Sequence, residues 1–285
     1  MSENKTTINW FPGHMAKANR QMKEQLKSVD LLIEVRDARI PFSSANPDLE
    51  KLAPQKPRII LLNKSDKADP VLTERWIHKL SDDTDIVISV NALNEQIKTP
   101  VYKAALQLTS LRRERQLRKG MKPTPIKAMV VGIPNAGKST VINSIAKKKI
   151  AVTADHPGVT KKVTWIKAAD DFYLLDTPGV LWPKIEDPDV GLRLAVTGAI
   201  RDEILPLDDM IRFALEYLLE HKENEFLSRY GIERPEGWED AVKKIGISKG
   251  MIQKGAEVDE LRVKKMLIKE IRSDKIGRIT WEIPQ

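Results

Sequence analysis

A glycine-rich stretch in the middle of the chain has the residue types and spacing needed to hold the phosphates of a nucleotide. From Gly132 to Ser139 it reads G-x-x-x-x-G-K-S, between an apolar run and a helical pattern. Glycines let backbone N–H groups converge on phosphate oxygens, and the start of a helix adds positive potential. We expect Lys138 to reach the β- and γ-phosphates and Ser139 to ligate Mg²⁺. The residues expected to line this phosphate site are Gly132, Asn135, Ala136, Gly137, Lys138, Ser139 and Thr140.

Two later segments could sense the third phosphate. The stretch LLDTPG ends an apolar run with Asp176 and Gly179. An aspartate there can hold Mg²⁺ through water, and the Gly179 N–H can contact a γ-phosphate, although the pattern alone also fits a tight turn. Between the two motifs lies DHPGVTKK, whose Thr160 is expected to close over the metal, with Thr153 as the weaker candidate.

An earlier stretch, NKSD, has the chemistry of a guanine reader. Residues 63–66 follow the apolar run 59–62, so a strand delivers them at its carboxyl end. The Asp66 carboxylate would accept from guanine N1–H and the exocyclic amine. Adenine would leave a buried carboxylate unpaired, at a cost of at least about 1–3 kcal/mol. The residues expected to contact or support the base are Asn63, Lys64, Ser65 and Asp66, with Ser89, Asn91 and Ala92 at the end of the next strand.

Alternating strands and helices must position these motifs. This alternation predicts an α/β sheet with helices on both faces. The expected strands are 30–38, 58–62, 85–90, 126–132 and a hairpin around ADD at 169–171; the expected helices are 15–28, 73–80, 96–118 and one from 138.

The order of the motifs is reversed relative to ordinary GTPases, because the base reader precedes the phosphate loop. Cutting the usual fold between its two halves and rejoining the old termini yields this order. Both halves still meet at the carboxyl edge of the sheet, and old termini lie close enough to join. We place the old junction in the basic joint at 117–125. The sequence therefore predicts a P-loop GTPase sheet with circularly permuted motif order.

Strand patterns end near residue 185, and only helical patterns follow. They cover 192–199, 209–221, 224–230, 238–245 and 258–271. We expect a circularly permuted GTPase domain at 1–184 and a smaller all-helical domain, which binds RNA, at 185–285. Because Asp176–Gly179 directly precede this second domain, nucleotide state could move it as a lever.

The charge is positive and clustered. The chain has 48 Lys and Arg against 40 Asp and Glu, a net charge of +8 and a pI near 9.4. From 98 to 127 a single acid, Glu114, stands among nine basic residues, and further blocks lie at 147–149, 161–162 and 262–278. Any one block could be a solvated helix face. Together they favour a polyanion such as RNA as partner.

The remaining composition excludes several classes of protein. No apolar run approaches the ~18–20 residues that span a bilayer, and the N-terminus lacks the apolar core of a signal peptide. There are no cysteines, and the four histidines are scattered. We therefore expect a cytoplasmic protein without thiolate metal sites or membrane contact. Nothing demands a dimer, and we expect a monomer.

The motif order NKSD, GIPNAGKST, DTPG, with WFPGHMAKA at the start, resembles the circularly permuted GTPases of ribosome assembly, the YlqF type. The resemblance spans the whole chain. It implies binding of GTP and GDP, and GTP hydrolysis stimulated by the large ribosomal subunit. It also implies a role in the late maturation of that subunit, with the helical domain contacting ribosomal RNA.

Two residue roles depend on this resemblance. Most small GTPases have a water-positioning Gln where this chain has Val180. The resemblance implies that His14 substitutes for it; without the resemblance, His14 would be a helix-start or packing residue. Asn135 matches GTPases that use K⁺ in place of an arginine finger, although it could also simply cap backbone groups inside the loop.

Four other interpretations are weaker. A membrane-bound or signalling G protein is disfavoured because Ser2 rather than glycine follows Met1 and no cysteine is available for lipidation. An ATP-using kinase for a small metabolite conflicts with NKSD, and an RNA-binding protein with a vestigial site conflicts with Lys138, Ser139 and Asp176. The remaining alternative is a GTP-dependent RNA-binding or signalling switch that acts on a non-ribosomal partner.

Overall fold

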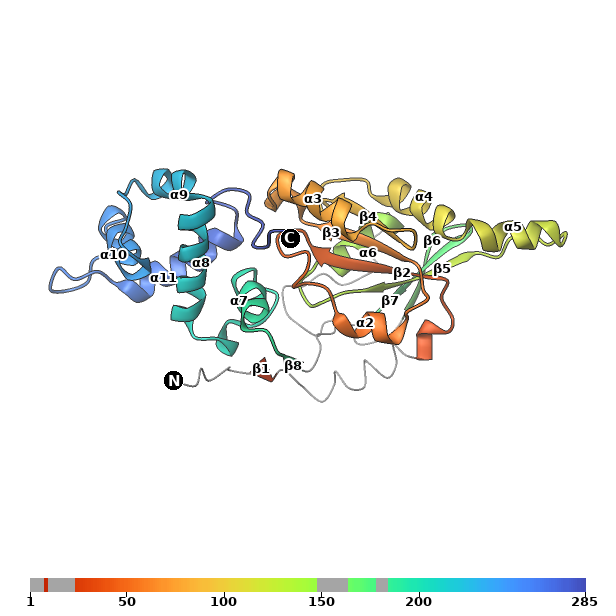
Figure 1. Ribbon diagram of the computed structural model, residues 1–285, viewed down its shortest axis with the longest axis horizontal. Coiled ribbons are helices and arrows are strands. Elements are labelled where there is room, and N and C mark those ends of the chain that lie inside the picture. The colour runs from red at the N-terminus through yellow and green to blue at the C-terminus, as the bar shows by residue number, and fades with distance from the viewer. Residues whose placement is uncertain (1–7, 10–23, 148–163, 178–183) are drawn as a thin grey trace.

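A six-stranded sheet forms the centre of the larger part of the molecule (Figure 1). The computed structural model describes residues 8–9, 24–147, 164–177 and 184–285. The strand order across the sheet is β4-β3-β2-β5-β7-β6. The strands are β2 Leu31–Asp37, β3 Arg58–Asn63, β4 Asp85–Val90, β5 Ile126–Val131, β6 Thr164–Ala169 and β7 Phe172–Asp176. A separate antiparallel pair joins β1 Ile8–Asn9 to β8 Lys184–Ile185.

The two halves of the permuted chain meet at the middle of this sheet. Strands β2, β3 and β4 come from the first half, β5 to β7 from the second, and β2 pairs with β5 in parallel. Only β6 runs antiparallel, in the expected hairpin with β7. Asp37 lies opposite Asn63, and Asn63 opposite Val90, so these strand ends share one edge. The permuted α/β fold predicted from the motif order is confirmed.

Helices cover both faces of the sheet, as alternate side chains of its strands require. On one face, α3 (Pro70–Leu80) packs Trp76 against Ile60 and Leu62. On the other, α4 (Lys98–Leu108) and α6 (Lys138–Ala146) pack against Ile33 and Ile59. The short α2 (Pro47–Leu52) joins the first face. Both faces of the sheet are therefore buried, and this packing fixes the position and direction of each strand end.

The helix expected over 96–118 is divided into two. Helix α4 ends at Leu108, and α5 spans Ser110–Arg118. The Thr109 hydroxyl donates to the Ala105 carbonyl at 2.7 Å, a local bond that competes with the helical pattern. Helix α5 has no buried residue and projects at the end of the molecule opposite the helical part (Figure 1).

After β8 the described chain is helical. The helices are α7 Pro188–Val196, η2 Asp202–Ile204, α8 Leu207–His221, α9 Glu223–Tyr230, α10 Trp238–Ser248 and α11 Glu260–Arg272. They match the expected helices to within a few residues at each end. Among the residues described, no helix is long and apolar enough to cross a membrane.

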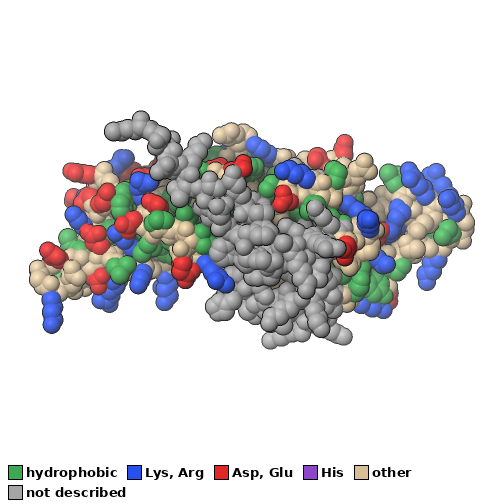
Figure 2. Space-filling view, turned by 90° about the horizontal axis from the view of Figure 1, so that it is seen from below, with side chains coloured by type: hydrophobic (Ala, Val, Ile, Leu, Met, Phe, Trp, Pro, Cys, Tyr) green, Lys and Arg blue, Asp and Glu red, His purple; other side chains and the backbone are tan. Residues whose placement is uncertain are grey.

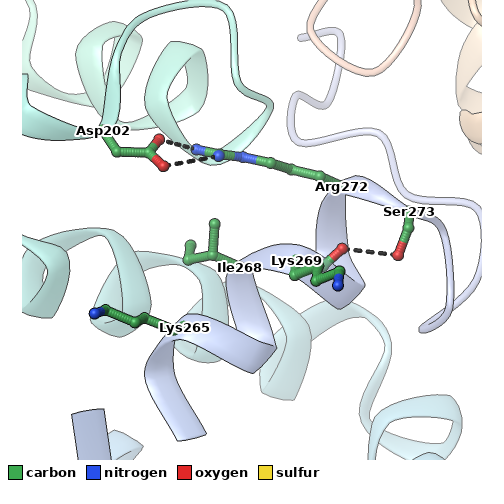
Figure 3. Close-up of a pocket in the computed structure, with 6 residues that line it drawn as sticks. All are labelled: Asp202, Lys265, Ile268, Lys269, Arg272 and Ser273. Carbon is green, nitrogen blue, oxygen red and sulfur yellow. Dashed lines mark hydrogen bonds and ion pairs between the residues drawn. The ribbon is translucent and has the colours of Figure 1, made fainter. Parts of the chain in front are cut away.

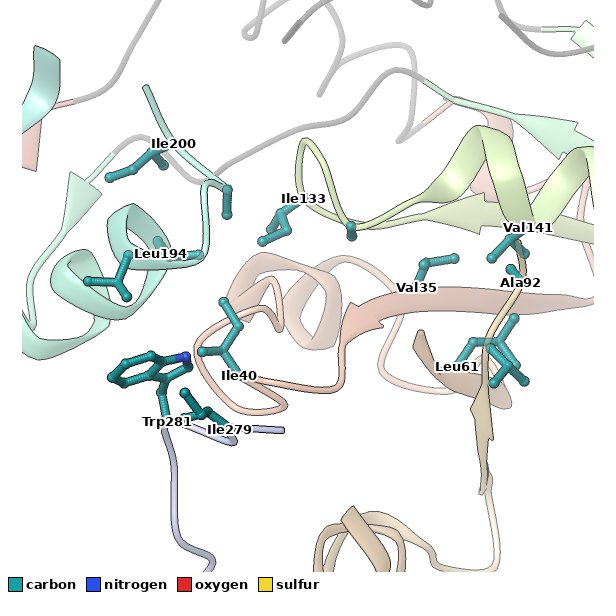
Figure 4. Close-up of a cluster of buried hydrophobic side chains, with 14 of the residues drawn as sticks. Val35, Ile40, Leu61, Ala92, Ile133, Val141, Leu194, Ile200, Ile279 and Trp281 are labelled. Atoms are coloured by element: carbon teal, nitrogen blue, oxygen red, sulfur yellow. The ribbon is translucent and has the colours of Figure 1, made fainter. Parts of the chain in front are cut away.

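The sheet part and the helical part share one continuous core. In Figure 4, Trp281 lies beside Leu194 of α7 and Ile40 of the loop after β2. Residues 279–285, here called the C-terminal strap, hydrogen-bond to the sheet part. The Trp281 N–H donates to the Arg39 carbonyl at 2.7 Å, and Trp76 Nε1 donates to the Glu282 carbonyl at 3.0 Å. A domain boundary at 184–185 stays a prediction.

Candidate nucleotide site

The glycine-rich loop between β5 and α6 makes two close approaches that a side chain would block. Gly132 has φ +150°, and a Cβ there would overlap the Val35 carbonyl of β2. Gly137 has φ +96°, and a Cβ there would overlap the Asn63 amide. Asn135, between them, also has a positive φ, +57°. The two glycines thus let the loop lie tightly against β2 at one end and against Asn63 of the base reader at the other.

Asn63 ties the base reader to the phosphate loop. Its Nδ2 donates to the Ala136 carbonyl at 2.9 Å, and its Oδ1 accepts from the Ala92 N–H at 3.1 Å. The ends of β3 and β4 and the phosphate loop are therefore connected by one buried side chain, 4 % exposed. The structure brings together these parts of the expected site.

Lys64 has a left-handed backbone, with φ +63°, which turns its side chain back over the phosphate loop. Its Nζ donates to the Asn135 carbonyl at 2.7 Å and to Asp37 Oδ2 at 2.9 Å. Ser65 and Asp66 follow in the 3₁₀ turn η1, Ser65–Lys67. Asp66 is exposed rather than buried in this structure, so its carboxylate is open to an incoming base.

The end of β4 supports this region mainly through its backbone. Ser89 is half-buried in β4, directly beside Leu62 of β3. The Asn91 side chain accepts from the N–H groups of Leu93 and Asn94 and so shapes its own turn. This segment therefore bonds to the base reader through its backbone, by the hydrogen bond that the Ala92 N–H donates to Asn63.

Lys138 and Asp176 place opposite charges at the phosphate end. Lys138 is 8 % exposed, and its Nζ donates to the Ile133 carbonyl at 2.8 Å. Burial lowers the pKa of Lys138 to about 8, against the opposing pull of Asp176. Burial also raises the pKa of Asp176, which Lys138 partly offsets. Burial thus disfavours the charged form of each group in the free protein, and a bound ion of opposite charge would favour it.

The donor set at this end fits Mg²⁺. Asp176 Oδ1 is buried and has no hydrogen-bond partner among the residues described. Ser139 and Thr140 lie half-buried in the first turn of α6. A carboxylate oxygen and a serine hydroxyl are both hard oxygen donors, which Mg²⁺ uses together with nucleotide phosphates. In the described ranges no cluster of three or more His, Asp or Glu side chains could hold a metal by itself.

Asn135 connects the loop to the helical part. Its Nδ2 donates to the Gly198 carbonyl, just after α7, at 2.9 Å. The amide oxygen Oδ1 is then the atom that could ligate a cation. Binding of K⁺ there stays a prediction.

Three expected site residues, His14, Thr160 and Gly179, lie outside the residues that the structure describes, as do Thr153 and Val180. Their assigned roles remain predictions.

Two residues that contact the site were not expected. Asp37 and Arg39 are 2 % and 3 % exposed, and they form an ion pair beside Lys64. The signal that pointed to NKSD could have found Asp37, since it too is a charged residue at the end of a buried strand. Arg39 carried no comparable signal.

Comparison with known proteins gives consistent results. The model of a family described as "50S ribosome-binding GTPase" matches residues 127–233. The match begins in β5 and omits the three strands of the first half, as a permuted order would require. Ribosome biogenesis GTPase A of Bacillus cereus is 44% identical over 279 residues, 98% of this chain and 94% of that protein. Mitochondrial ribosome-associated GTPase 1 of Xenopus tropicalis is 36% identical over 86% of this chain and 81% of its own length.

A solved structure has the same fold. The crystal structure of GNP-bound YlqF from T. maritima superposes with a TM-score of 0.64 at 27% identity, over 94% of this chain and 99% of that one. A guanine reader, a phosphate loop and a permuted sheet thus occur here in the same combination as in proteins that hydrolyse GTP. The chain belongs to the ribosome biogenesis GTPase A family.

Proposed function

We propose that this GTPase binds the large ribosomal subunit late in its assembly, and that the particle stimulates GTP hydrolysis. It acts as a monomer in the cytoplasm, and hydrolysis reports completion and releases it. The names of the full-length relatives support a ribosomal partner. The observation in the structure that carries the proposal is the projecting basic helix α5.

Helix α5 and the loop after it, residues 110–122, form what we call the basic arm. Two of its arginines anchor it: Arg112 pairs with Asp30, and Arg113 with Asp171 at 3.3 Å. Its other cations are exposed, and Figure 2 shows Lys and Arg side chains gathered at this end of the molecule. A helix anchored by two ion pairs, with exposed positive charges along it, suits the phosphate backbone of RNA.

A second basic surface lies on α11, in the helical part. A cavity of about 540 Å³ is lined by Asp202, Lys265, Ile268, Lys269, Arg272 and Ser273 (Figure 3). Arg272 is engaged with Asp202 and with the Ala195 carbonyl. Lys265 and Lys269, both exposed, are therefore the cations of this cavity that can meet an RNA phosphate.

The residues of the site divide the work of hydrolysis. Lys138 and the N–H groups of the loop hold the phosphates, and Asp66 accepts from guanine. Mg²⁺, held by Ser139, Asp176 and Thr160, would neutralise phosphate charge, and K⁺ at Asn135 would add to it.

The remaining steps fall to residues outside the described ranges. The Gly179 N–H contacts the γ-phosphate and reports its presence. His14 positions the attacking water.

The test is GTP turnover in KCl, with purified large subunits, with small subunits, and with neither. The proposal expects a strong, saturable stimulation by large subunits alone. Absence of stimulation together with tight GTP binding would favour a guanine switch for a non-ribosomal partner. Competition by ATP as effective as that by GTP would instead point to a kinase. Equal rates in NaCl and KCl would remove the role of K⁺.

A further inference from the structure

A buried chain of ion pairs begins at the guanine reader. Asp37, the last residue of β2, accepts from Lys64 Nζ at 2.9 Å. The same carboxylate is held by Arg39, with Nε to Oδ1 at 3.0 Å and Nη2 to Oδ2 at 2.8 Å. Lys64 in turn donates to the Asn135 carbonyl. Asp37 therefore fixes the lysine of NKSD against the phosphate loop.

This chain continues into the helical part. Arg39 Nη2 also donates to the Thr197 carbonyl at 3.1 Å, at the end of α7. Gly198, the next residue, accepts from Asn135 Nδ2. Arg39, which Asp37 links to the base reader, and the phosphate loop thus each hold one carbonyl of the same turn. The C-terminal strap also holds the Arg39 backbone, because the Trp281 N–H donates to the Arg39 carbonyl.

The charges in this chain depend on one another. Burial alone would raise the pKa of Asp37, but Arg39 and Lys64 hold it far below its ordinary value. Burial lowers the pKa of Lys64, and Asp37 opposes that shift. Removing the carboxylate would leave the buried Arg39 cation and the half-buried Lys64 cation without the anion that they share, an unfavourable arrangement.

We propose that Asp37 and Arg39 are positioning residues of the guanine site, and that through the turn at Thr197–Gly198 they couple nucleotide binding to α7. Asp37 acts on the nucleotide through Lys64, which it keeps in place. Arg39 links this ion pair to the helical part, so that occupancy of the site restrains the first helix that follows the γ-phosphate sensor.

The first test is a double-mutant cycle on affinity for fluorescent GDP. Asp37→Asn should weaken GDP binding about tenfold to a hundredfold, because the charge-assisted bond to Lys64 is removed. In a Lys64→Met background the same change should add less than about twofold, since its route to the nucleotide is gone. Full additivity of the two changes would overturn the proposal.

A matched control comes from another ion pair of the same sheet. Arg58 and Asp85 pair at the amino ends of β3 and β4, and Arg58 Nε donates to Asp85 Oδ1 at 3.0 Å. Asp85→Asn should lower thermal stability and leave GDP affinity unchanged. If Asp85→Asn weakens GDP as much as Asp37→Asn, the effect is general destabilisation, and the positioning role fails.

The second test measures coupling by hydrogen exchange. In the unaltered protein, saturating GDP should slow amide exchange in 193–200, while 238–248 in α10 stays unchanged. Arg39→Gln should abolish this protection even when GDP is again saturating. Equal protection in Arg39→Gln, or none in the unaltered protein, would refute the coupling. Both tests use nucleotide alone, so they can fail or succeed independently of any ribosomal partner.

Discussion

In the free protein, burial already makes the protonated form of Lys138 less favourable than it is in water. Its ammonium is buried and donates to the Ile133 carbonyl. The negative charge of Asp176 opposes the effect of burial on the pKa of Lys138. Nucleotide phosphates would supply the missing negative charge. The lysine should therefore gain a proton, and hold it more firmly, when a nucleotide binds.

The first prediction follows from this shift. With a pKa of about 8 in the free protein, Lys138 binds about half a proton on taking up GDP at pH 8. GDP affinity should fall as the pH rises above about 8. Calorimetry in buffers of different ionisation enthalpy measures the uptake directly. At pH 6.5 Lys138 is already protonated, so its uptake should vanish there.

The pH dependence of folding stability has the opposite sign to that of GDP affinity. The pKa of Lys138 is lower in the folded protein than in the unfolded chain, where it is about 10.4. Between these values the unfolded chain binds more protons, so this group makes the free protein more stable as the pH rises from about 8 towards 10.

The second prediction concerns His14. His14→Ala should keep GTP affinity and lose the turnover stimulated by large subunits, because binding and water positioning use different residues. His78→Ala is the matched control, since the side chain of His78 is 80% exposed on α3. Stimulated turnover that survives His14→Ala would remove the catalytic role.

At the residue scale, sequence reasoning found the groups that carry their own local signal. Asn63, Lys64 and Lys138 stand at strand or helix ends in recognisable patterns, and the structure bonds Asn63 and Lys64 to the loop that leads to Lys138. Arg39 escaped because the group that it bonds in the helical part, the Thr197 carbonyl, lies 158 positions away. A single sequence does not reveal contacts of that separation. Asp66 is exposed in this structure, and the burial of its carboxylate under a bound base stays a prediction.

At the scale of elements, α5 departs most from the usual reason for a helix. It buries no residue, and Leu111 and Leu117 are 68% and 59% exposed. A helix of nine residues that packs against nothing is marginal by itself. Its continuation from α4 and the ion pairs of Arg112 and Arg113 hold it. Such a helix is suited to packing against a partner.

The third prediction tests the basic arm. Replacing Arg115, Lys119 and Lys122 by Gln should weaken binding to large subunits. It should also reduce the dependence of log K on log salt by about one unit for each RNA phosphate that the arm no longer neutralises. Binding measured across a salt series gives both values. GTP affinity without subunits should not change.

A control variant separates the contribution of the basic arm from that of the total charge of the protein. Lys27, Lys51 and Lys243 are also exposed, and changing them to Gln removes the same total charge elsewhere. If both triple variants lose the same affinity, the arm is not a specific contact, and the α11 surface becomes the better candidate.

The helical pattern over 96–118 indicated the presence of helix correctly but missed its division. At the break, the Thr109 hydroxyl donates to a carbonyl of the preceding turn, a bond that often bends a helix. The strand ends were easier to place, because buried apolar runs stop abruptly at polar residues.

At the scale of the whole molecule, the C-terminal strap is what unites the two parts. Trp281 is 1 % exposed within the shared core, where its ring contacts Phe213 and Tyr217 and lies beside Ile40 (Figure 4). Glu282 accepts from two N–H groups of the loop after β2. The loop that carries Arg39 is thus held by the strap.

The fourth prediction is that Trp281→Ala destabilises the protein by about 3–5 kcal/mol, the usual cost of truncating a large buried aromatic side chain. GDP affinity should also fall, since the Arg39 loop loses its support. Urea unfolding with and without GDP measures both. Trp165→Ala is the control: Trp165 is 41% exposed, and its loss should have little effect on either quantity. If the folded Trp281→Ala variant keeps its GDP affinity, the C-terminal strap does not support the nucleotide site.

The permuted sheet could be predicted, because the motifs mark which strand ends must share an edge. The strap could not. Its bond from Trp76 to Glu282 spans 206 positions and involves only a ring nitrogen and a carbonyl. Nothing in the local pattern of 279–285 distinguishes it from a loose tail.

The strap also constrains the order in which the protein can fold. Strands β2 to β4 can pair early, yet the loop holding Arg39 stays unfastened until residues some 240 positions later have been made and have returned to it. Contacts of such separation form late and slowly. During synthesis, then, a growing chain passes through a stage with a formed sheet but an unfinished guanine site. It would become able to bind its nucleotide tightly only after residues 279–285 have been made.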